Sequence, residues 1–145
     1  MSIETIADIT TPLRTYATLL LDRAADLHQA LLRHYERERG MKEFISVQLD
    51  DGNIAVAIPS LKLNCLSRNR LVFSGKELVA EIEFFTCKAE DEISILKCYL
   101  TTQGRFIFHS IGTEPQYDFY SDQSIEPRLF GRLFSAASEK KLISL

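Results

Sequence analysis

Apolar residues in the first third of the chain recur at helical spacing. Steps of four and three residues separate the members of one stripe, which are Leu13, Ala17, Leu20, Ala24, Leu27 and Leu31. Residues at this spacing share one face of a helix. Thr11 and Pro12 are typical of a helix start, and Gly40 is typical of the residue that follows a helix end. The pattern therefore predicts a helix over 12–39, about 42 Å long at 1.5 Å per residue.

After Gly40 the apolar period changes to two, which is typical of strands. The alternating apolar positions are Ile45, Val47 and Leu49 before Asp51 and Gly52, and Ile54, Val56 and Ile58 after them. An Asp-Gly pair favours a two-residue hairpin turn, because both central residues of that turn need a positive φ. Closing the chain there pairs Leu49 with Ile54, Val47 with Val56 and Ile45 with Ile58. All six apolar side chains then lie on one face.

Further alternating segments predict more strands. One runs from Leu61 and ends at 67–70, a short one covers 71–73, and one covers 78–84, although 77–83 also fits a helix. Segments 93–101 and 105–110 flank Gln103 and Gly104, so they predict a hairpin. A two-residue turn at that point pairs Leu100 with Ile107, Tyr99 with Phe108 and Cys98 with His109.

The remainder of the chain predicts a loop over 112–123 and a last helix. Ser124 and Pro127 open this helix over 126–141, and its apolar face consists of Leu129, Phe130, Leu133, Phe134 and Ala137. The fold class is therefore α+β. We expect a long N-terminal helix, an antiparallel sheet of about five to six strands over 43–110 arranged as a meander of hairpins, and a short C-terminal helix.

Composition and charge narrow the class of protein. A chain of 145 residues has the size of one domain, so we expect a single domain over 1–145. Hydrophobic residues make up 46% and charged residues 26%, which is typical of a globular protein and too apolar for disorder. The net charge is −3 without a basic stripe, which argues against nucleic acid and against an anionic membrane surface as partners.

The cysteines and the N-terminal segment predict the compartment. Cys65, Cys87 and Cys98 are widely spaced and odd in number, which indicates free thiols in a reducing environment. The N-terminal segment contains no apolar run, so it predicts neither a signal peptide nor a membrane anchor. We therefore expect a cytoplasmic protein.

Motifs for catalysis, metal binding and phosphate binding are absent from the sequence. His28 and His34 are six residues apart, which does not place both on one helix face, and Cys98 with His109 supplies only two ligands. The six glycines are scattered and form no phosphate-binding loop. No serine or cysteine lies in a nucleophile motif. The sequence predicts no metal and no cofactor, and it favours a non-enzymatic protein over an enzyme.

Glu81 and Glu83 are the one carboxylate pair on a predicted strand face. A buried pair can carry out acid–base chemistry, whereas an exposed pair is only the wet face of a strand. Because antiparallel sheets commonly leave one face in water, the second interpretation is favoured.

Two segments are candidates for binding a partner. The first is an aromatic-acidic loop, formed by Tyr117, Asp118, Phe119, Tyr120 and Asp122. Aromatic residues are enriched at interface centres, although Phe119 could instead fold back into the core. The second is the acidic cluster Glu90, Asp91 and Glu92, which is most simply a solvated turn and which could also attract a basic partner.

The N-terminal helix is a third candidate, for contact with a second copy of the chain. A helix of about 42 Å outruns a sheet about 20 Å across, so part of the stripe from Leu13 to Leu31 could form a homodimer. The alternative is that the whole stripe packs on the sheet as an ordinary α+β core. The sequence leaves both open.

These observations lead to two hypotheses for function. The first is a non-enzymatic protein of the chaperone, immunity or adaptor type, which binds another protein through its sheet surface or its aromatic-acidic loop. The alternative is a carrier, sensor or enzyme for a small hydrophobic ligand held between the long helix and the sheet. Phenylalanines would line such a pocket, namely Phe84, Phe85, Phe106, Phe108, Phe130 and Phe134.

Overall fold

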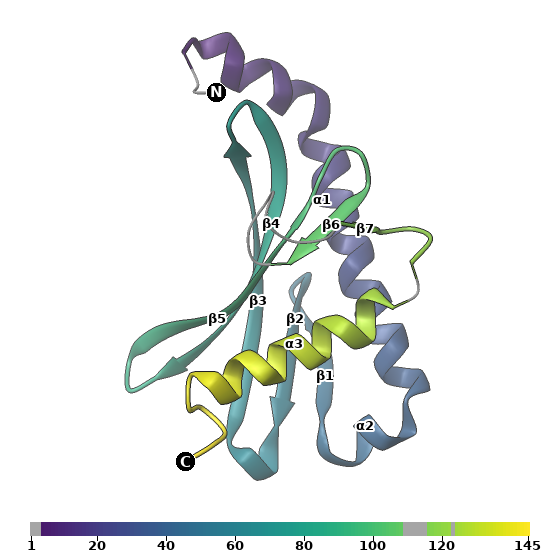
Figure 1. The fold of residues 1–145 in the computed structure, drawn as a ribbon, viewed down its shortest axis with the longest axis vertical. Helices are drawn as coiled ribbons and strands as arrows, with labels where there is room; N and C mark the ends of the chain where they lie inside the picture. The colour runs from purple at the N-terminus through teal and green to yellow at the C-terminus, as the bar shows by residue number, and fades with distance from the viewer. Residues whose placement is uncertain (1–3, 109–115, 123) are drawn as a thin grey trace.

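A computed structural model describes residues 4–108, 116–122 and 124–145 (Figure 1). The elements in chain order are α1 (Ile6–Arg37), α2 (Arg39–Phe44), β1 (Ser46–Asp50), β2 (Asn53–Ile58), the 3-10 turn η1 (Pro59–Leu61), β3 (Leu63–Ser74), β4 (Glu77–Lys88), β5 (Asp91–Leu100), β6 (Arg105–Phe108), β7 (Tyr117–Asp118) and α3 (Ile125–Glu139). The described strands form one seven-stranded antiparallel sheet, in which spatial order equals chain order. The predicted α+β meander is confirmed, whereas the predicted count of five to six strands was too low.

Helix α1 begins and ends earlier than the predicted 12–39. Thr5 caps it, because the Thr5 hydroxyl accepts a hydrogen bond from the N–H of Asp8 and the Asp8 carboxylate accepts one from the N–H of Thr5. Pro12 therefore lies inside the helix instead of opening it. The helix ends at Arg37 because Glu38 has an extended backbone, and Gly40 belongs to α2, which leads the chain into β1.

Strand β3 is longer than the sequence pattern suggested. It continues through 67–70, where the sequence predicted an end, and forms a twelve-residue strand that pairs with the equally long β4. Polar residues continue this pairing, since Arg68 lies opposite Glu83 and Arg70 lies opposite Glu81. The seventh strand, β7, comes from the segment that was expected to be a loop, and it pairs Tyr117 with Phe106.

The two predicted hairpins differ in outcome. The Asp51-Gly52 hairpin has the predicted register, with Leu49 opposite Ile54 and Val47 opposite Val56. The hairpin at Gln103 and Gly104 is shifted by one residue, so that Leu100 lies opposite Phe106, Tyr99 opposite Ile107 and Cys98 opposite Phe108. Its loop has three residues, because the N–H of Thr101 bonds to the carbonyl of Arg105 and Gly104 adopts a φ of 77°. His109, the predicted partner of Cys98, lies outside the described residues.

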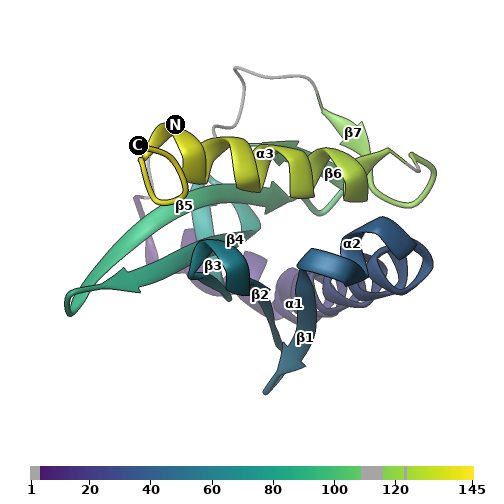
Figure 2. The ribbon, with the colours of Figure 1, turned by 90° about the horizontal axis from the view of Figure 1, so that it is seen from below.

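Helices α1 and α3 pack on the same, concave face of the curled sheet (Figures 1 and 2). The residues that the register places on this face form one core with both helices, and Phe84, Phe106 and Phe108 at its centre are fully buried. The opposite, outer face carries Val79 and Ile107, which are buried but lie outside that core. Among the described residues no helix is long and apolar enough to cross a membrane.

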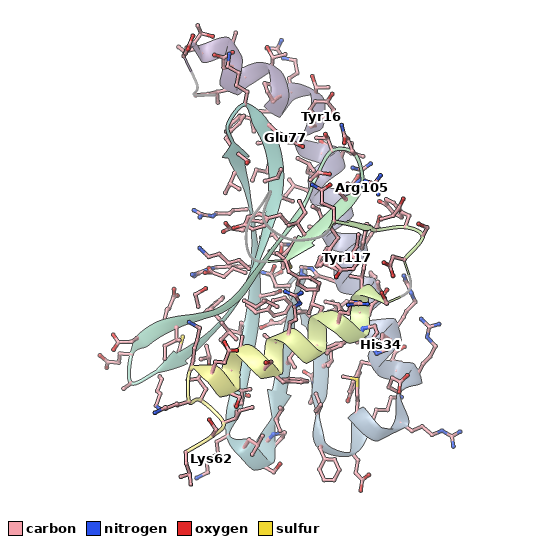
Figure 3. The ribbon with its side chains drawn as sticks, viewed as in Figure 1. Tyr16, His34, Lys62, Glu77, Arg105 and Tyr117 are labelled. Atoms are coloured by element: carbon pink, nitrogen blue, oxygen red, sulfur yellow. The ribbon has the colours of Figure 1, made fainter. Side chains whose placement is uncertain are left out.

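The N-terminal half of α1 runs along the tip of the β3–β4 hairpin. Figure 3 places Glu77, at this tip, beside that half of the helix, and Nζ of Lys76 lies 3.9 Å from a carboxylate oxygen of Asp8. The long helix is therefore matched by an unusually long hairpin, which covers more of it than a sheet of average strands would cover.

Candidate functional site

The predicted dimer stripe on α1 is largely used inside the chain. Leu20, Ala24, Leu27 and Leu31 are all 0% exposed in the core. Leu13 and Ala17 are half-buried, and Leu13 packs against the same core. In this structure four of the six stripe residues therefore have no surface to offer a second subunit. The exposed large apolar residues of α1 lie elsewhere on the helix, at Ile6, Ile9, Tyr16, Leu19 and Leu21.

The aromatic-acidic loop is folded back onto the protein. Tyr117 and Phe119 pack against the core, and Tyr120 is 62% exposed. The Tyr120 hydroxyl donates a hydrogen bond to Asp26 at 3.3 Å, and the Arg23 guanidinium lies 5.8 Å from the centre of its ring.

The two aspartates of this loop organise its backbone. Asp118 accepts hydrogen bonds from the N–H groups of Tyr120 and Ser121. Asp122 accepts hydrogen bonds from the backbone and hydroxyl of Ser124, the residue that precedes α3. These bonds hold the pKa of Asp122 below its usual value. Of the loop residues predicted to bind a partner, Tyr120 offers the largest exposed aromatic side chain.

The acidic cluster at 90–92 is divided by the β4–β5 turn. The turn residues are Ala89 and Glu90, both with positive φ (52° and 71°), while Asp91 and Glu92 begin β5. A carboxylate oxygen of Glu92 accepts a hydrogen bond from Arg68 at 2.9 Å. The cluster is therefore not a uniform acidic patch, because Glu90 lies in a turn with positive φ and the carboxylate of Glu92 is bonded to Arg68.

On the outer face of the sheet, the expectation that Glu81 and Glu83 are solvated was wrong. Their side chains are only 7% and 11% exposed. Oε1 of Glu81 accepts a hydrogen bond from Nε of Arg70 at 2.9 Å, and Oε1 of Glu83 accepts one from Nε of Arg68 at 2.7 Å. The signal was present in the sequence: arginines at 68 and 70 and glutamates at 81 and 83 become neighbours once one long hairpin is assumed.

Glu83 is the most densely bonded group of this face. The Ser94 hydroxyl donates to its second oxygen at 2.7 Å, and Nζ of Lys97 lies 3.9 Å from the same oxygen. Burial raises the pKa of Glu83, but the hydrogen bonds from Ser94 and Arg68, aided by the charges of Arg68 and Lys97, outweigh burial and lower it overall. A carboxylate that is held ionised by several hydrogen bonds is a poor general base, so we assign Glu83 a structural role.

The cations of the outer face lie above these carboxylates. The side chain of Arg70 is 67% exposed, that of Arg68 46% and that of Lys97 40%. The Arg68 guanidinium also stacks over the ring of Phe85, 4.2 Å from its centre. The outer face thus presents positive groups and a stacked aromatic ring, with Glu81 and Glu83 buried beneath them and Glu92 exposed beside Arg68.

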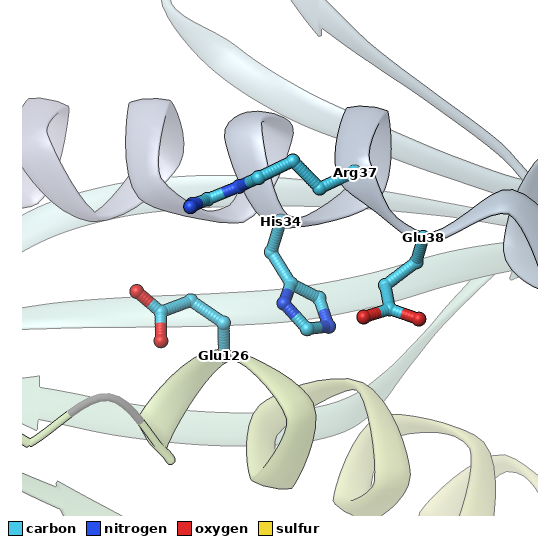
Figure 4. A pocket seen from close by; sticks show the side chains of 4 residues that line it. All are labelled: His34, Arg37, Glu38 and Glu126. Atoms are coloured by element: carbon cyan, nitrogen blue, oxygen red, sulfur yellow. The ribbon is translucent and has the colours of Figure 1, made fainter.

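A groove lies between the end of α1, α2 and α3. Its polar part has a volume of about 360 Å³ and is lined by His34, Arg37, Glu38 and Glu126. Figure 4 shows these side chains converging from α1, from the junction between α1 and α2, and from α3. An adjoining hollow of about 310 Å³ shares His34 and Glu38 and has an apolar lining of Met41, Ile45, Pro127, Phe130 and Phe134. The ring of His34 stacks on Phe130 at 5.9 Å.

The phenylalanines expected around a ligand pocket are divided among three places. Phe84, Phe106 and Phe108 fill the space between α1 and the sheet. Phe85 lies on the outer face under Arg68, and the pair Phe130 and Phe134 lines the groove. Space for an apolar ligand is therefore found between helices, in the groove.

Among the described residues, no histidines, cysteines and carboxylates form a group of three or more that could hold a metal ion. His28 is buried and bonds through Nδ1 to the carbonyl of Gly52 at 3.0 Å. Burial raises the pKa of Cys65 to about 11 and raises that of Cys98 further, so both thiols stay protonated. Cys87 is exposed.

The fold thus defines an α+β protein in which two helices share one face of an antiparallel meander. Comparison with protein-family models, with curated protein sequences and with solved structures gives no match. The outer face and the groove are the two candidate binding surfaces of the described residues.

Proposed function

We propose that this is a non-enzymatic protein-binding protein, of the adaptor, chaperone or immunity-protein type, whose binding surface is the outer face of the sheet. One observation carries this proposal. The arginines of this face are exposed and held in place through Nε by the buried carboxylates of Glu83 and Glu81, and Arg68 is held in addition by the exposed Glu92. Arginine and aromatic residues are enriched at the energetic centres of protein interfaces, and pre-positioned side chains lose less entropy on binding.

Apolar surface accompanies the charge. Leu66 is 39% exposed and lies opposite Phe85, next to the stacked Arg68 guanidinium. An apolar centre flanked by charged groups is the usual composition of a protein-binding patch.

The test compares matched variants in a capture experiment from the source cell. Leu66→Asp places a charge at the exposed centre of the outer face, and Phe44→Asp does the same at the exposed Phe44 of α2. We expect one stoichiometric partner with the wild type and with Phe44→Asp, and its loss with Leu66→Asp. Circular dichroism checks that both variants fold. Equal retention of the partner by both variants would overturn the assignment of this surface.

A second candidate function is supported by the groove. Hollows of about 310 and 360 Å³ fall at the lower end of ligand-pocket volumes, and the smaller one has an apolar lining with His34 and Glu38 at its edge. We propose a small hydrophobic or amphiphilic ligand as the alternative occupant. Native mass spectrometry of the purified protein tests this: a co-purified ligand that Phe134→Asp removes supports the alternative, and an unliganded mass counts against it.

We further propose a cytoplasmic location. The three cysteines are free, which agrees with a reducing compartment.

A homodimer through α1 would have to use exposed positions of this helix, such as Ile6 and Tyr16, since most of the stripe from Leu13 to Leu31 is buried. Light scattering with Tyr16→Asp as the comparison variant tests that arrangement.

A further inference from the structure

We propose that the outer face recognises an acidic protein segment in extended conformation, with carboxylates on alternate residues. This inference rests on the proposed function and names the chemistry of the partner. It is drawn from the spacing, the bonding and the exposure of Arg68, Arg70 and Lys97.

The spacing of the arginines matches an extended peptide. Arg68 and Arg70 lie two residues apart on β3 and therefore project from the same face about 7 Å apart. Alternate side chains of an extended segment have the same separation. Lys97 lies on β5, two strands away from β3, about 10 Å across the sheet. Two carboxylates of one segment can thus reach both arginines, while the lysine contributes from the side.

The ion pairs of Arg68 and Arg70 leave some of their guanidinium N–H groups available as hydrogen-bond donors. Arg70 uses Nε to bind Glu81, and its two terminal nitrogens make no hydrogen bond to any other residue that the structure describes. Arg68 uses Nε for Glu83 and one terminal nitrogen for Glu92. A guanidinium fixed through Nε presents its terminal nitrogens in a defined direction, which suits a carboxylate acceptor.

The chain already contains one such contact. Glu92 reaches Arg68 from β5 with a side chain that is 53% exposed, so it acts as an internal acidic ligand on one of the two arginines. An incoming carboxylate must compete with it. Removing the Glu92 charge should therefore strengthen the binding of an acidic segment, which is the opposite of what loss of a merely structural ion pair would do.

The same charges argue for a short protein segment rather than a nucleic acid. The whole chain carries a net charge of −3, and the turn next to Glu92 adds Glu90 and Asp91. A long polyanion would meet repulsion beyond these few cations, whereas a segment with two or three carboxylates fits within them.

The test uses a fluorescein-labelled peptide of five Glu-Ser repeats, with a peptide of five consecutive glutamates and five serines as the spacing control. Fluorescence anisotropy at low salt measures binding to the wild type, Glu92→Gln, Arg70→Gln and Arg39→Gln. Arg39 is an exposed arginine on α2, outside the outer face, so its variant removes the same charge elsewhere. A single-stranded oligonucleotide of equal charge serves as the other class of probe.

We expect the alternating peptide to bind the wild type more tightly than the block peptide, and Arg70→Gln to weaken binding about fivefold or more. Glu92→Gln should tighten binding, and Arg39→Gln should leave it unchanged.

Arg70→Gln also removes the arginine that bonds to buried Glu81, so this variant could fail to fold. The exposed position of Glu92 makes Glu92→Gln an independent test of the inference in that case. Absence of binding to both wild type and Glu92→Gln, an equal effect of Arg39→Gln, or tighter binding of the oligonucleotide would overturn the inference. If the acidic-segment inference fails in this way, the capture experiment can still show that Leu66→Asp loses the native partner. Failure of the inference is therefore distinguishable from failure of the proposed function.

Discussion

His28 is a buried side chain whose hydrogen bonds should contribute measurably to the stability of the protein. It is 1% exposed, bonds through Nδ1 to the carbonyl of Gly52 at 3.0 Å, and lies with Nε2 3.3 Å from the Ser67 hydroxyl. That hydroxyl in turn accepts a hydrogen bond from the N–H of Ile54 at 2.8 Å. One imidazole therefore joins α1 to the turn of the β1–β2 hairpin and to β3.

We predict that His28→Leu lowers the free energy of unfolding at pH 7.5 by about 1–2 kcal/mol. The substitution removes both hydrogen bonds of the imidazole. The cost stays moderate because Gly52 is exposed, so water can bond to its carbonyl, and because Ser67 keeps its bond to Ile54.

The pH dependence of the free energy of unfolding shows whether the buried imidazole of His28 causes this loss of stability. Burial lowers the pKa of His28 in the folded protein below 6.5, although its bond to Gly52 acts in the opposite direction. Below pH 6.5 the unfolded chain therefore binds the proton more readily than the folded chain does. The wild type then loses stability as the pH falls from 6.5 towards the folded pKa, by up to about 1.4 kcal/mol per pH unit.

Urea denaturation followed by circular dichroism at pH 7.5, 6.5 and 5.5 measures both effects. Carboxylates and the other histidines contribute to wild type and variant alike, so the difference between the two proteins isolates His28. We expect the destabilisation by His28→Leu to shrink as the pH falls. If the two proteins lose stability in parallel over this range, the assignment of a neutral, buried His28 is refuted.

Three further predictions concern stability. Glu90→Gly should raise the free energy of unfolding by about 0.5–1 kcal/mol, because Glu90 has a φ of 71° that glycine adopts without strain; a lower midpoint in urea would contradict the strained turn. Thr5→Ala should cost about 1 kcal/mol by removing the capping box with Asp8, with Thr10→Ala, an exposed position within α1, as the control in thermal unfolding. Phe84→Ala should cost about 3–5 kcal/mol by opening a cavity at the centre of the core, and a loss below 1 kcal/mol would show that this ring is not enclosed.

Some features could be predicted from the sequence because their causes are local. The register of the β1–β2 hairpin follows from Asp51 and Gly52, whose positive φ values (51° and 82°) define the turn between two alternating segments. The apolar face of α3 follows from its helical spacing, and Leu129, Phe130, Leu133 and Ala137 are all buried as that spacing implies. In both cases the deciding residues lie within a few positions of one another.

Other features depended on which distant segments meet. The cap at Thr5 made Pro12 an interior residue, and one extra loop residue before Arg105 shifted a whole hairpin by one position. The candidate site is of this kind as well. Polar residues at 67–70 looked like the end of a strand, yet they continue β3 because Glu81 and Glu83 lie opposite them on β4.

The sequence by itself determined the two helical faces, the Asp51-Gly52 hairpin and the α+β class, since periodicity and turn chemistry act over short range. Only the tertiary structure decided that Glu81 and Glu83 are buried and that most of the apolar stripe of α1 packs into the core. It also decided that Phe130 and Phe134 line a groove. Burial depends on the curvature of the sheet and on the packing of elements far apart in the chain, and neither is encoded in local spacing.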